Sequence, residues 1–133
     1  RVLVKDLTFT NLRVKVRCRP ESGSTDQACG LIFRAQDSDN YYVTRANALE
    51  GNVRLYHTVQ RSRVEFASGN ATVQSGTWST LEVQAAGNSI TVSWNGTPVI
   101  SNASDSTFAK GKIGLWTKAD SVTAFDDLEA TAQ

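Results

Sequence analysis

Guanidinium, amide and phenol groups are concentrated near the middle of the chain, where they alternate with apolar residues. Side chains on a β-strand point to opposite faces in turn, so Arg45 and Asn47 share one face of an expected strand. Asn52, Arg54 and Tyr56 share one face of the next. Planar donors bind hydroxyls and carboxylates, and aromatic rings offer flat apolar surface. These groups together are suited to binding a sugar.

Other polar residues are expected to extend this patch from neighbouring strands. Arg34 and Gln36 lie on the solvent face of the preceding strand, and Trp116 alternates with Leu115 and so points away from the core. The alternative is an ordinary polar exterior of a sheet. The expected ligand-binding residues are Arg34, Gln36, Arg45, Asn47, Asn52, Arg54, Tyr56, Trp116 and Lys118.

Catalytic groups are sparse. A glycoside hydrolase needs two acids facing each other across a groove, and Glu65 and Glu82 each stand alone on their expected strands. The only histidine, His57, is in phase with Val53 and Leu55 and is expected to be a core or edge residue, not a general base. The acids expected near the patch are Glu50, Asp120 and Asp26.

Metal ligands are also few. Asp126 and Asp127 are adjacent in an otherwise apolar segment, which is costly unless one is paired or binds a cation. Calcium takes oxygen ligands, so a structural Ca²⁺ site at these two residues is one interpretation. Exposed or ion-paired acids are the other. The acidic run 37–40 is expected to be a turn between strands, and no other cofactor is expected.

The gross composition restricts the partners. The chain has 133 residues, enough for a single domain spanning 1–133, and a formal net charge of +1. Nucleic-acid-binding domains are usually strongly basic, so no nucleic-acid partner is expected. No apolar run approaches the roughly 20 residues of a membrane span, so no membrane insertion is expected. The oligomeric state stays open.

Period-two alternation predicts an all-β fold, a two-sheet antiparallel jelly-roll sandwich. Asn95-Gly96 predicts a tight hairpin with positive φ at both positions. The apolar phase slips near Thr10-Asn11, which predicts a bulge or bend. Strands are expected near 2–4, 7–18, 29–36, 40–48, 52–59, 62–67, 78–86, 89–95, 97–101, 111–118 and 121–131.

Two cysteines, Cys18 and Cys29, lie at the ends of a polar loop between expected strands. Opposed residues on neighbouring antiparallel strands are close enough for a disulfide, so a Cys18–Cys29 bond is one prediction. Two buried free thiols are the alternative. A disulfide points to an oxidising compartment.

Several segments resemble a known family: Asp26–Asp37 (DQACGLIFRAQD), Asn40–Tyr56, 114–122 (GLWTKADSV) and 125–128 (FDDL). They are similar to bacterial proteins of the concanavalin A-like lectin/glucanase superfamily, and more narrowly to laminin-G-like domains labelled 3-keto-disaccharide hydrolase-like. The resemblance covers nearly the whole chain. It implies a jelly roll with a concave and a convex sheet, often in exported proteins, and a sugar ligand. It supplies no catalytic residue.

We therefore expect a carbohydrate-binding, lectin-like domain that uses its concave sheet face and has no catalysis of its own. One alternative is a glycoside hydrolase-like enzyme acting on oligosaccharides, and another is a laminin-G-like protein-interaction domain. A secreted or periplasmic location is expected from the predicted disulfide and the resemblance.

Overall fold

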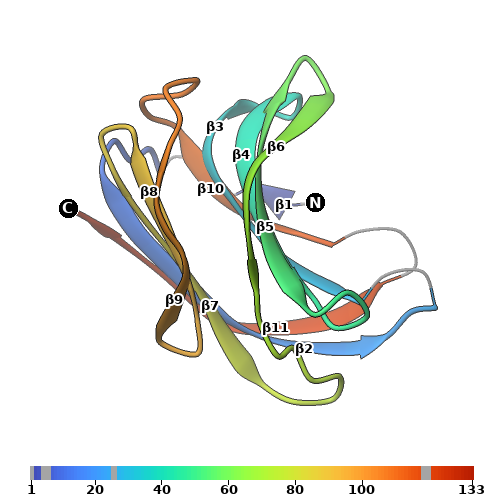
Figure 1. The fold of residues 1–133 in the computed structure, drawn as a ribbon. Coiled ribbons are helices and arrows are strands. Elements are labelled where there is room, and N and C mark those ends of the chain that lie inside the picture. Colours follow the sequence, from blue (N-terminus) through green and yellow to red (C-terminus); the bar gives the residue numbers. More distant parts are fainter. Residues whose placement is uncertain (1, 4–6, 25–26, 118–120) are drawn as a thin grey trace.

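The computed structural model describes residues 2–3, 7–24, 27–117 and 121–133, which form eleven strands in two antiparallel sheets facing each other (Figure 1). None of the described residues forms a helix able to cross a membrane. The strands are β1 (Val2–Leu3), β2 (Leu12–Ser22), β3 (Ala28–Asp37), β4 (Asn40–Asn47), β5 (Asn52–Val59), β6 (Ser62–Asn70), β7 (Ser79–Ala86), β8 (Ser89–Trp94), β9 (Thr97–Ser104), β10 (Lys112–Trp116) and β11 (Val122–Ala132).

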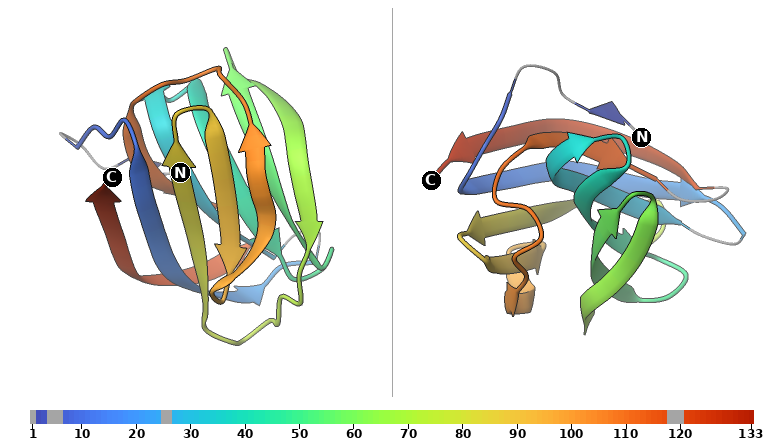
Figure 2. Two further views of the ribbon diagram at one scale, coloured as in Figure 1. Left: turned by 60° about the vertical axis from the view of Figure 1, so that its left-hand side comes forward. Right: turned by 90° about the horizontal axis from the view of Figure 1, so that it is seen from above.

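The two sheets are built mostly from hairpins. The six-stranded sheet has the order β1-β10-β3-β4-β5-β6, and the five-stranded sheet has the order β11-β2-β7-β8-β9. Figure 2 shows β2 and β11, the two longest strands, running side by side near one edge of the sandwich. The all-β jelly-roll prediction is confirmed, and ten of the eleven expected strands match closely in position.

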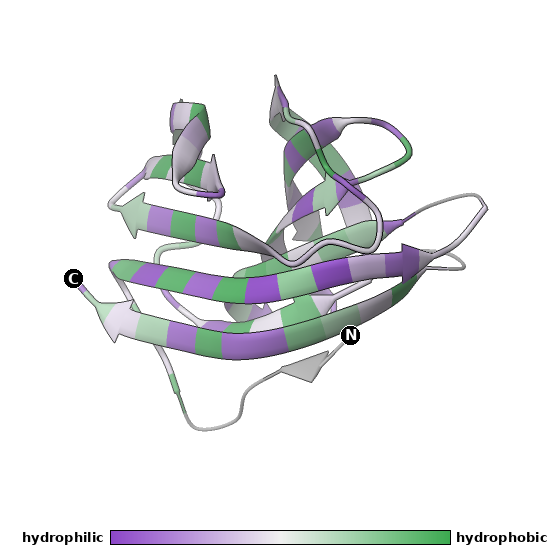
Figure 3. Cartoon of the chain, turned by 90° about the horizontal axis from the view of Figure 1, so that it is seen from below, coloured by the Kyte–Doolittle hydropathy of each residue, from purple (hydrophilic) through white to green (hydrophobic). Residues whose placement is uncertain are grey.

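The main core lies between the sheets, and strands such as β2 and β7 bury every second side chain there. On β2, Leu12, Val14 and Val16 are at most 1% exposed, and the charged residues between them point outward. Figure 3 shows this alternation as green and purple bands along the strands. On the strands with this alternation, the period-two pattern read from the sequence decides which face is buried, whereas β3 and β4 are buried on both faces.

Two predicted turns are confirmed. Asn95 and Gly96 have φ of 51° and 82°, as a hairpin of this type requires. Phe9 forms an isolated bridge with Gly111, directly before β10 of the six-stranded sheet, whereas β2 of the five-stranded sheet begins only at Leu12. The phase slip near residues 10–11 is thus a bend at which the chain crosses from one sheet to the other.

The disulfide is confirmed, with a geometry different from the expected one. Cys18 and Cys29 are bonded, with Cα atoms 6.3 Å apart. Cys18 is on β2 and Cys29 on β3, and these strands belong to different sheets. The bond therefore joins the two sheets through the core, where both residues are fully buried, instead of linking two paired strands.

Candidate functional site

The outward side of the six-stranded sheet, hereafter the outer face, carries most of the predicted binding residues. Backbone register aligns them in rows that run across β10, β3, β4, β5 and β6. The rows are Trp116–Gly30–Arg45–Arg54–Ser68, then Gly114–Ile32–Val43–Tyr56–Glu65, and finally Tyr41–Thr58–Arg63 on β4, β5 and β6.

An apolar and aromatic floor occupies the middle of the outer face. Ile32 and Val43 are fully buried, and Tyr41 and Tyr56 are each 6% exposed. Trp116 is half-buried and packs against this group. These residues form a small second apolar cluster outside the main core, in which Trp116 is the most exposed aromatic side chain.

Gly30 makes room for the indole. A Cβ built at Gly30 would lie 2.9 Å from both Cε3 and the backbone oxygen of Trp116, too close for any side chain. The absence of a side chain at Gly30 therefore lets the Trp116 ring lie over β3 toward the middle of the face.

Arg63 reaches the same place from the opposite flank. Its guanidinium carbon lies 4.6 Å from the centre of the Tyr56 ring and 5.6 Å from that of Trp116. Three strands separate β10, which carries Trp116, from β6, which carries Arg63. The two side chains nevertheless meet over the middle of the outer face.

A network of charged groups lies on the outer face beside the aromatic side chains. One carboxylate, Glu50, joins two arginines, accepting from Arg45 Nη2 at 3.1 Å and pairing with Arg54 Nη2 at 3.0 Å. Arg54 also pairs with Glu65 at 3.1 Å. Burial by itself lowers the pKa of Arg54, but the two carboxylates outweigh it and the net shift is upward.

This network changes the expected chemistry of the patch. Sequence reasoning included the arginines but not Glu65, which stands alone on its strand, and it considered Glu50 only as a possible catalytic acid. Both carboxylates are bound to arginines. The patch thus offers fixed donors and acceptors together, which is the requirement for hydroxyl-rich ligands.

The two predicted asparagines hold this network in position. Asn52 Oδ1 accepts from Arg45 Nη1 at 3.1 Å, and Asn47 Nδ2 donates to Glu50 at 3.1 Å. Asn47 Oδ1 also accepts from the backbone of Leu49 at 2.9 Å. Arg45 is 1% exposed, and its Nε has no hydrogen-bond partner.

Arg34 and Gln36 do not lie with the other predicted residues. Arg34 has φ of 48°, and the register between β3 and β4 shifts just after Phe33. An irregularity of this kind reverses the faces of the residues that follow. The Arg34 guanidinium is buried and donates to the backbone oxygens of Thr10, Gly87 and Phe108, at 2.9, 2.7 and 3.2 Å.

Gln36 follows the same reversal. Its side-chain amide donates to the backbone oxygens of Arg34 and Lys110. The prediction that Arg34 and Gln36 lie on the outer face is therefore wrong. Both side chains instead bind backbone carbonyls, most of them in loops. Alternation alone gives no sign of the shift.

A cavity of about 410 Å³ opens at one end of the outer face. Thr58 lines it and is 3% exposed, and its hydroxyl has no hydrogen-bond partner. The cavity lies between the turns that link β3 to β4 and β5 to β6. Its lining residues are Ser38, Tyr41, Thr58, Arg61 and Arg63.

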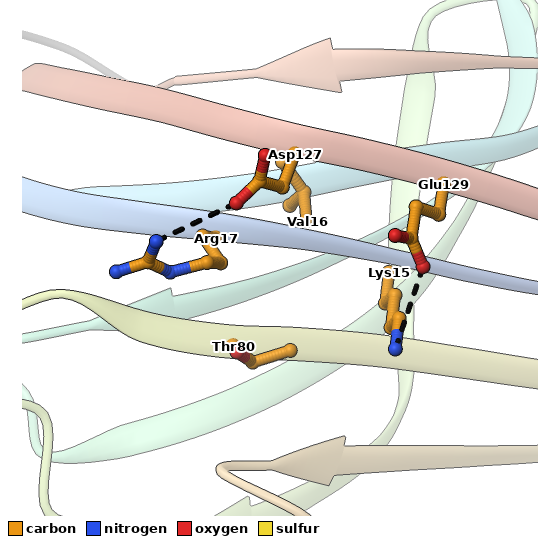
Figure 4. Close-up of a pocket in the computed structure, with 6 residues that line it drawn as sticks. All are labelled: Lys15, Val16, Arg17, Thr80, Asp127 and Glu129. Carbon is orange, nitrogen blue, oxygen red and sulfur yellow. Dashed lines mark hydrogen bonds and ion pairs between the residues drawn. The ribbon is translucent and has the colours of Figure 1, made fainter.

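A smaller cavity, of about 150 Å³, lies on the outward side of the five-stranded sheet (Figure 4). Two ion pairs cross it: Lys15 with Glu129, and Arg17 with Asp127, both at 3.4 Å. Each lining cation therefore has a lining carboxylate as its partner.

Asp126 and Asp127, the predicted calcium ligands, lie on the exposed strand β11. Asp126 Oδ1 accepts from the backbone of Asp127 at 2.9 Å, and Asp127 pairs with Arg17. Within the described part of the chain, no group of three or more His, Cys, Asp or Glu residues gathers as a metal site would require. Lys118, Asp120 and Asp26 lie outside the described residues.

A separate hydrogen-bonded cluster lies beside the main core of the sandwich. Asp105 accepts from the Tyr42 hydroxyl at 2.6 Å and contacts His57 Nδ1 at 2.8 Å. Burial by itself raises the pKa of Asp105, but hydrogen bonds from Thr107, Tyr42 and His57 outweigh it and hold the pKa at about 2. Burial, together with the bond to Asp105, raises the pKa of Tyr42 to about 12. His57 is thus a satisfied edge histidine, as predicted.

This cluster predicts a loss of stability in acid. Because the folded pKa of Asp105 is depressed, its contribution is complete above the unfolded value near 3.9 and is lost as the pH falls toward 2. A shift of this size corresponds to about 2 kcal/mol. Urea titrations of wild type and Asp105→Asn give the difference between their free energies of unfolding. We expect this difference to fall by about 2 kcal/mol between pH 5 and pH 2. Exposed Asp126→Asn is the control, and an unchanged Asp105→Asn gap would contradict the assignment.

Solved structures with the same architecture come from several organisms. The carbohydrate-binding module CBM66 from Bacillus subtilis has a TM-score of 0.85 at 20% identity, covering 96% of this chain and 78% of that one. A B. subtilis protein with a galectin-like fold has a TM-score of 0.75 at 18% identity, covering 93% and 73%. The Caenorhabditis elegans galectin LEC-6 has a TM-score of 0.70 at 16% identity, covering 98% and 88%.

Comparison of sequences gives a more direct relationship. No curated protein matches the chain. The family described as 3-keto-alpha-glucoside-1,2-lyase-like domain matches residues 1–131. This match spans both sheets and the whole outer face, and the chain therefore belongs to the family of 3-keto-alpha-glucoside-1,2-lyase-like domains.

Proposed function

We propose that this domain binds carbohydrate on the outer face of the six-stranded sheet and catalyses no reaction itself. The observation that carries the proposal is the convergence of Trp116, Tyr56 and Arg63 over an apolar floor. Structural neighbours described as a carbohydrate-binding module and as galectins support a sugar as the class of ligand.

Within the proposed site, the aromatic rings and the charged border have separate roles. Trp116 is only partly buried and presents apolar surface to a sugar ring, while Tyr56 supports it as part of the buried floor. Arg54 is partly exposed and donates to ligand hydroxyls, and Arg45, Asn47 and Asn52 keep it and Glu50 in place. An open face buries little of its ligand, so a modest affinity is expected.

The proposed site predicts that Trp116→Ala weakens glycan binding at least tenfold, because a tryptophan at the centre of an interface commonly contributes about 2 kcal/mol. Binding to a glycan found on an array would be measured by calorimetry. Trp78→Ala is the matched control, since Trp78 also lies against arginines, Arg17 and Arg19, but on β2's side of the molecule. Equal binding by wild type and Trp116→Ala would refute the proposed site.

The family description favours a second candidate, an enzyme acting on 3-keto-glucosides. In the described part of the outer face, Glu50 and Glu65 are the carboxylates, and both are ion-paired with Arg54. Turnover of a 3-keto-glucoside or a β-glucan by the purified domain would favour this candidate. A protein-interaction role like that of laminin-G modules would instead be favoured by a defined partner in pull-downs.

We also propose a secreted or periplasmic location. The Cys18–Cys29 disulfide supports it, because disulfides persist mainly in oxidising compartments. Fractionation of the source cells tests this proposal, and recovery in the cytosol with both thiols reduced would oppose it.

A further inference from the structure

The arginines of the outer face differ in whether they have carboxylate partners. Arg45 and Arg54 are held by Glu50, and Arg54 also by Glu65. Arg61 pairs with Asp39 at 3.1 Å, although its own side chain is 83% exposed. Arg63 is exposed, and no carboxylate among the described residues forms an ion pair with it.

Contact with the aromatic rings leaves the hydrogen-bonding edge of Arg63 available. A guanidinium lying over a ring uses its flat face in the cation–π contact. Its N–H groups point out from the edge in a fork that matches a carboxylate or sulfate. Arg63 therefore lies against Tyr56 and Trp116, and no ion pair with a described carboxylate occupies its N–H groups.

The 410 Å³ cavity beside Arg63 has an unusual lining. Two of its five lining residues, Arg61 and Arg63, are cations, and none is acidic. This contrasts with the smaller cavity of Figure 4, in which every lining cation is paired with a lining carboxylate. Of these two cavities, the larger is the one whose lining cations outnumber its lining acids.

Thr58 provides an independent indication of a polar ligand. Its hydroxyl is buried without a partner, and an unpartnered buried hydroxyl is destabilising. Threonine side chains change between staggered rotamers, and such a rotation would turn the hydroxyl of this cavity-lining residue toward a bound group. A ligand oxygen in the cavity would then supply the missing partner.

We propose that the carbohydrate bound by this domain is anionic, and that its carboxylate or sulfate group enters the cavity lined by Tyr41, Thr58 and Arg63. This inference rests on the proposed sugar-binding function and narrows its ligand class. The sugar ring packs beside Trp116 and Tyr56, and Arg63 forms the ion pair with the acidic group.

The test compares pairs of ligands with and without an ionised acidic group. Binding of oligogalacturonate and of its fully methyl-esterified form is measured by calorimetry, and sulfated dextran oligosaccharides are compared with unsulfated ones to identify the acidic group. We expect the charged member of a pair to bind at least tenfold more tightly, and Arg63→Gln to remove most of that preference. Arg13→Gln, on the other sheet, is the matched control and is expected to leave it unchanged.

Failure of the inference is distinguishable from failure of the proposed function. If the domain binds neutral glycans on an array, and neither ligand charge nor Arg63→Gln alters the affinity, the anionic-ligand inference is wrong and the sugar-binding proposal stands. If no glycan of either kind binds, both are wrong. A charge preference that persists in Arg63→Gln would overturn the assignment of the acidic group to this cavity.

Discussion

Loss of the Cys18–Cys29 disulfide is expected to lower the free energy of unfolding by about 3 kcal/mol. The bond closes a loop with a sequence separation of 11 residues, and opening a loop of that size gives the unfolded chain conformational entropy that lowers its free energy by about 3 kcal/mol. The bond also ties β2 to β3 across the core, so its loss frees the two sheets from each other at one end.

Urea denaturation of the Cys18→Ala/Cys29→Ala variant, compared with wild type, measures this effect. Dithiothreitol should destabilise wild type by a similar amount and leave the double variant unaffected, which separates the bond from other effects of the reductant. A change below about 0.5 kcal/mol in both experiments would show that the disulfide contributes little to stability.

Replacement of Arg34 by methionine is expected to destabilise the protein by about 3 kcal/mol. Methionine retains much of the apolar stem but donates no hydrogen bonds, so the carbonyls of Thr10, Gly87 and Phe108 lose a shared donor. Buried acceptors left without partners cost about 1–3 kcal/mol each. Three segments distant in sequence depend on this one guanidinium.

Two further substitutions, Arg34→Lys and Arg13→Met at the surface, are the controls for Arg34→Met. Arg34→Lys should be intermediate, because an ammonium keeps the charge but lacks the planar fork. Arg13→Met breaks an exposed ion pair with Glu82 and should cost less than about 1 kcal/mol. Similar losses for Arg34→Met and Arg13→Met would refute the structural role of Arg34.

The alternation of apolar and polar residues correctly predicted the face on which most residues of the candidate site lie. On β4 and β5 the register is regular, so Arg45, Arg54 and Tyr56 lie on one face as predicted. Tyr41 and Thr58 lie in phase with them and were accessible to the same reasoning, although they were not included. Arg34 was misplaced because the irregularity in β3 has no signature in the apolar pattern.

Contacts across strands were not accessible from the sequence. Glu65 is eleven residues from Arg54 and on a different strand, yet the two are ion-paired. Arg63 and Trp116 are more than fifty residues apart, on two strands of one sheet with three other strands between them, yet their side chains meet. Pairings of this kind depend on the order and register of strands, which local patterns do not encode.

The polar and aromatic patch between residues 40 and 56 was recognisable from the sequence by itself, as were the strands that carry it and the cysteines that form the disulfide. A side-chain period of two determines faces wherever the register is regular. Only the tertiary structure decided that the disulfide joins two sheets, that the central arginines are neutralised by glutamates, and that Arg63 stands over the aromatic rings without a described carboxylate partner. The physical reason is that alternation specifies direction relative to a strand, whereas charge pairing and contacts between distant side chains depend on which strands become neighbours.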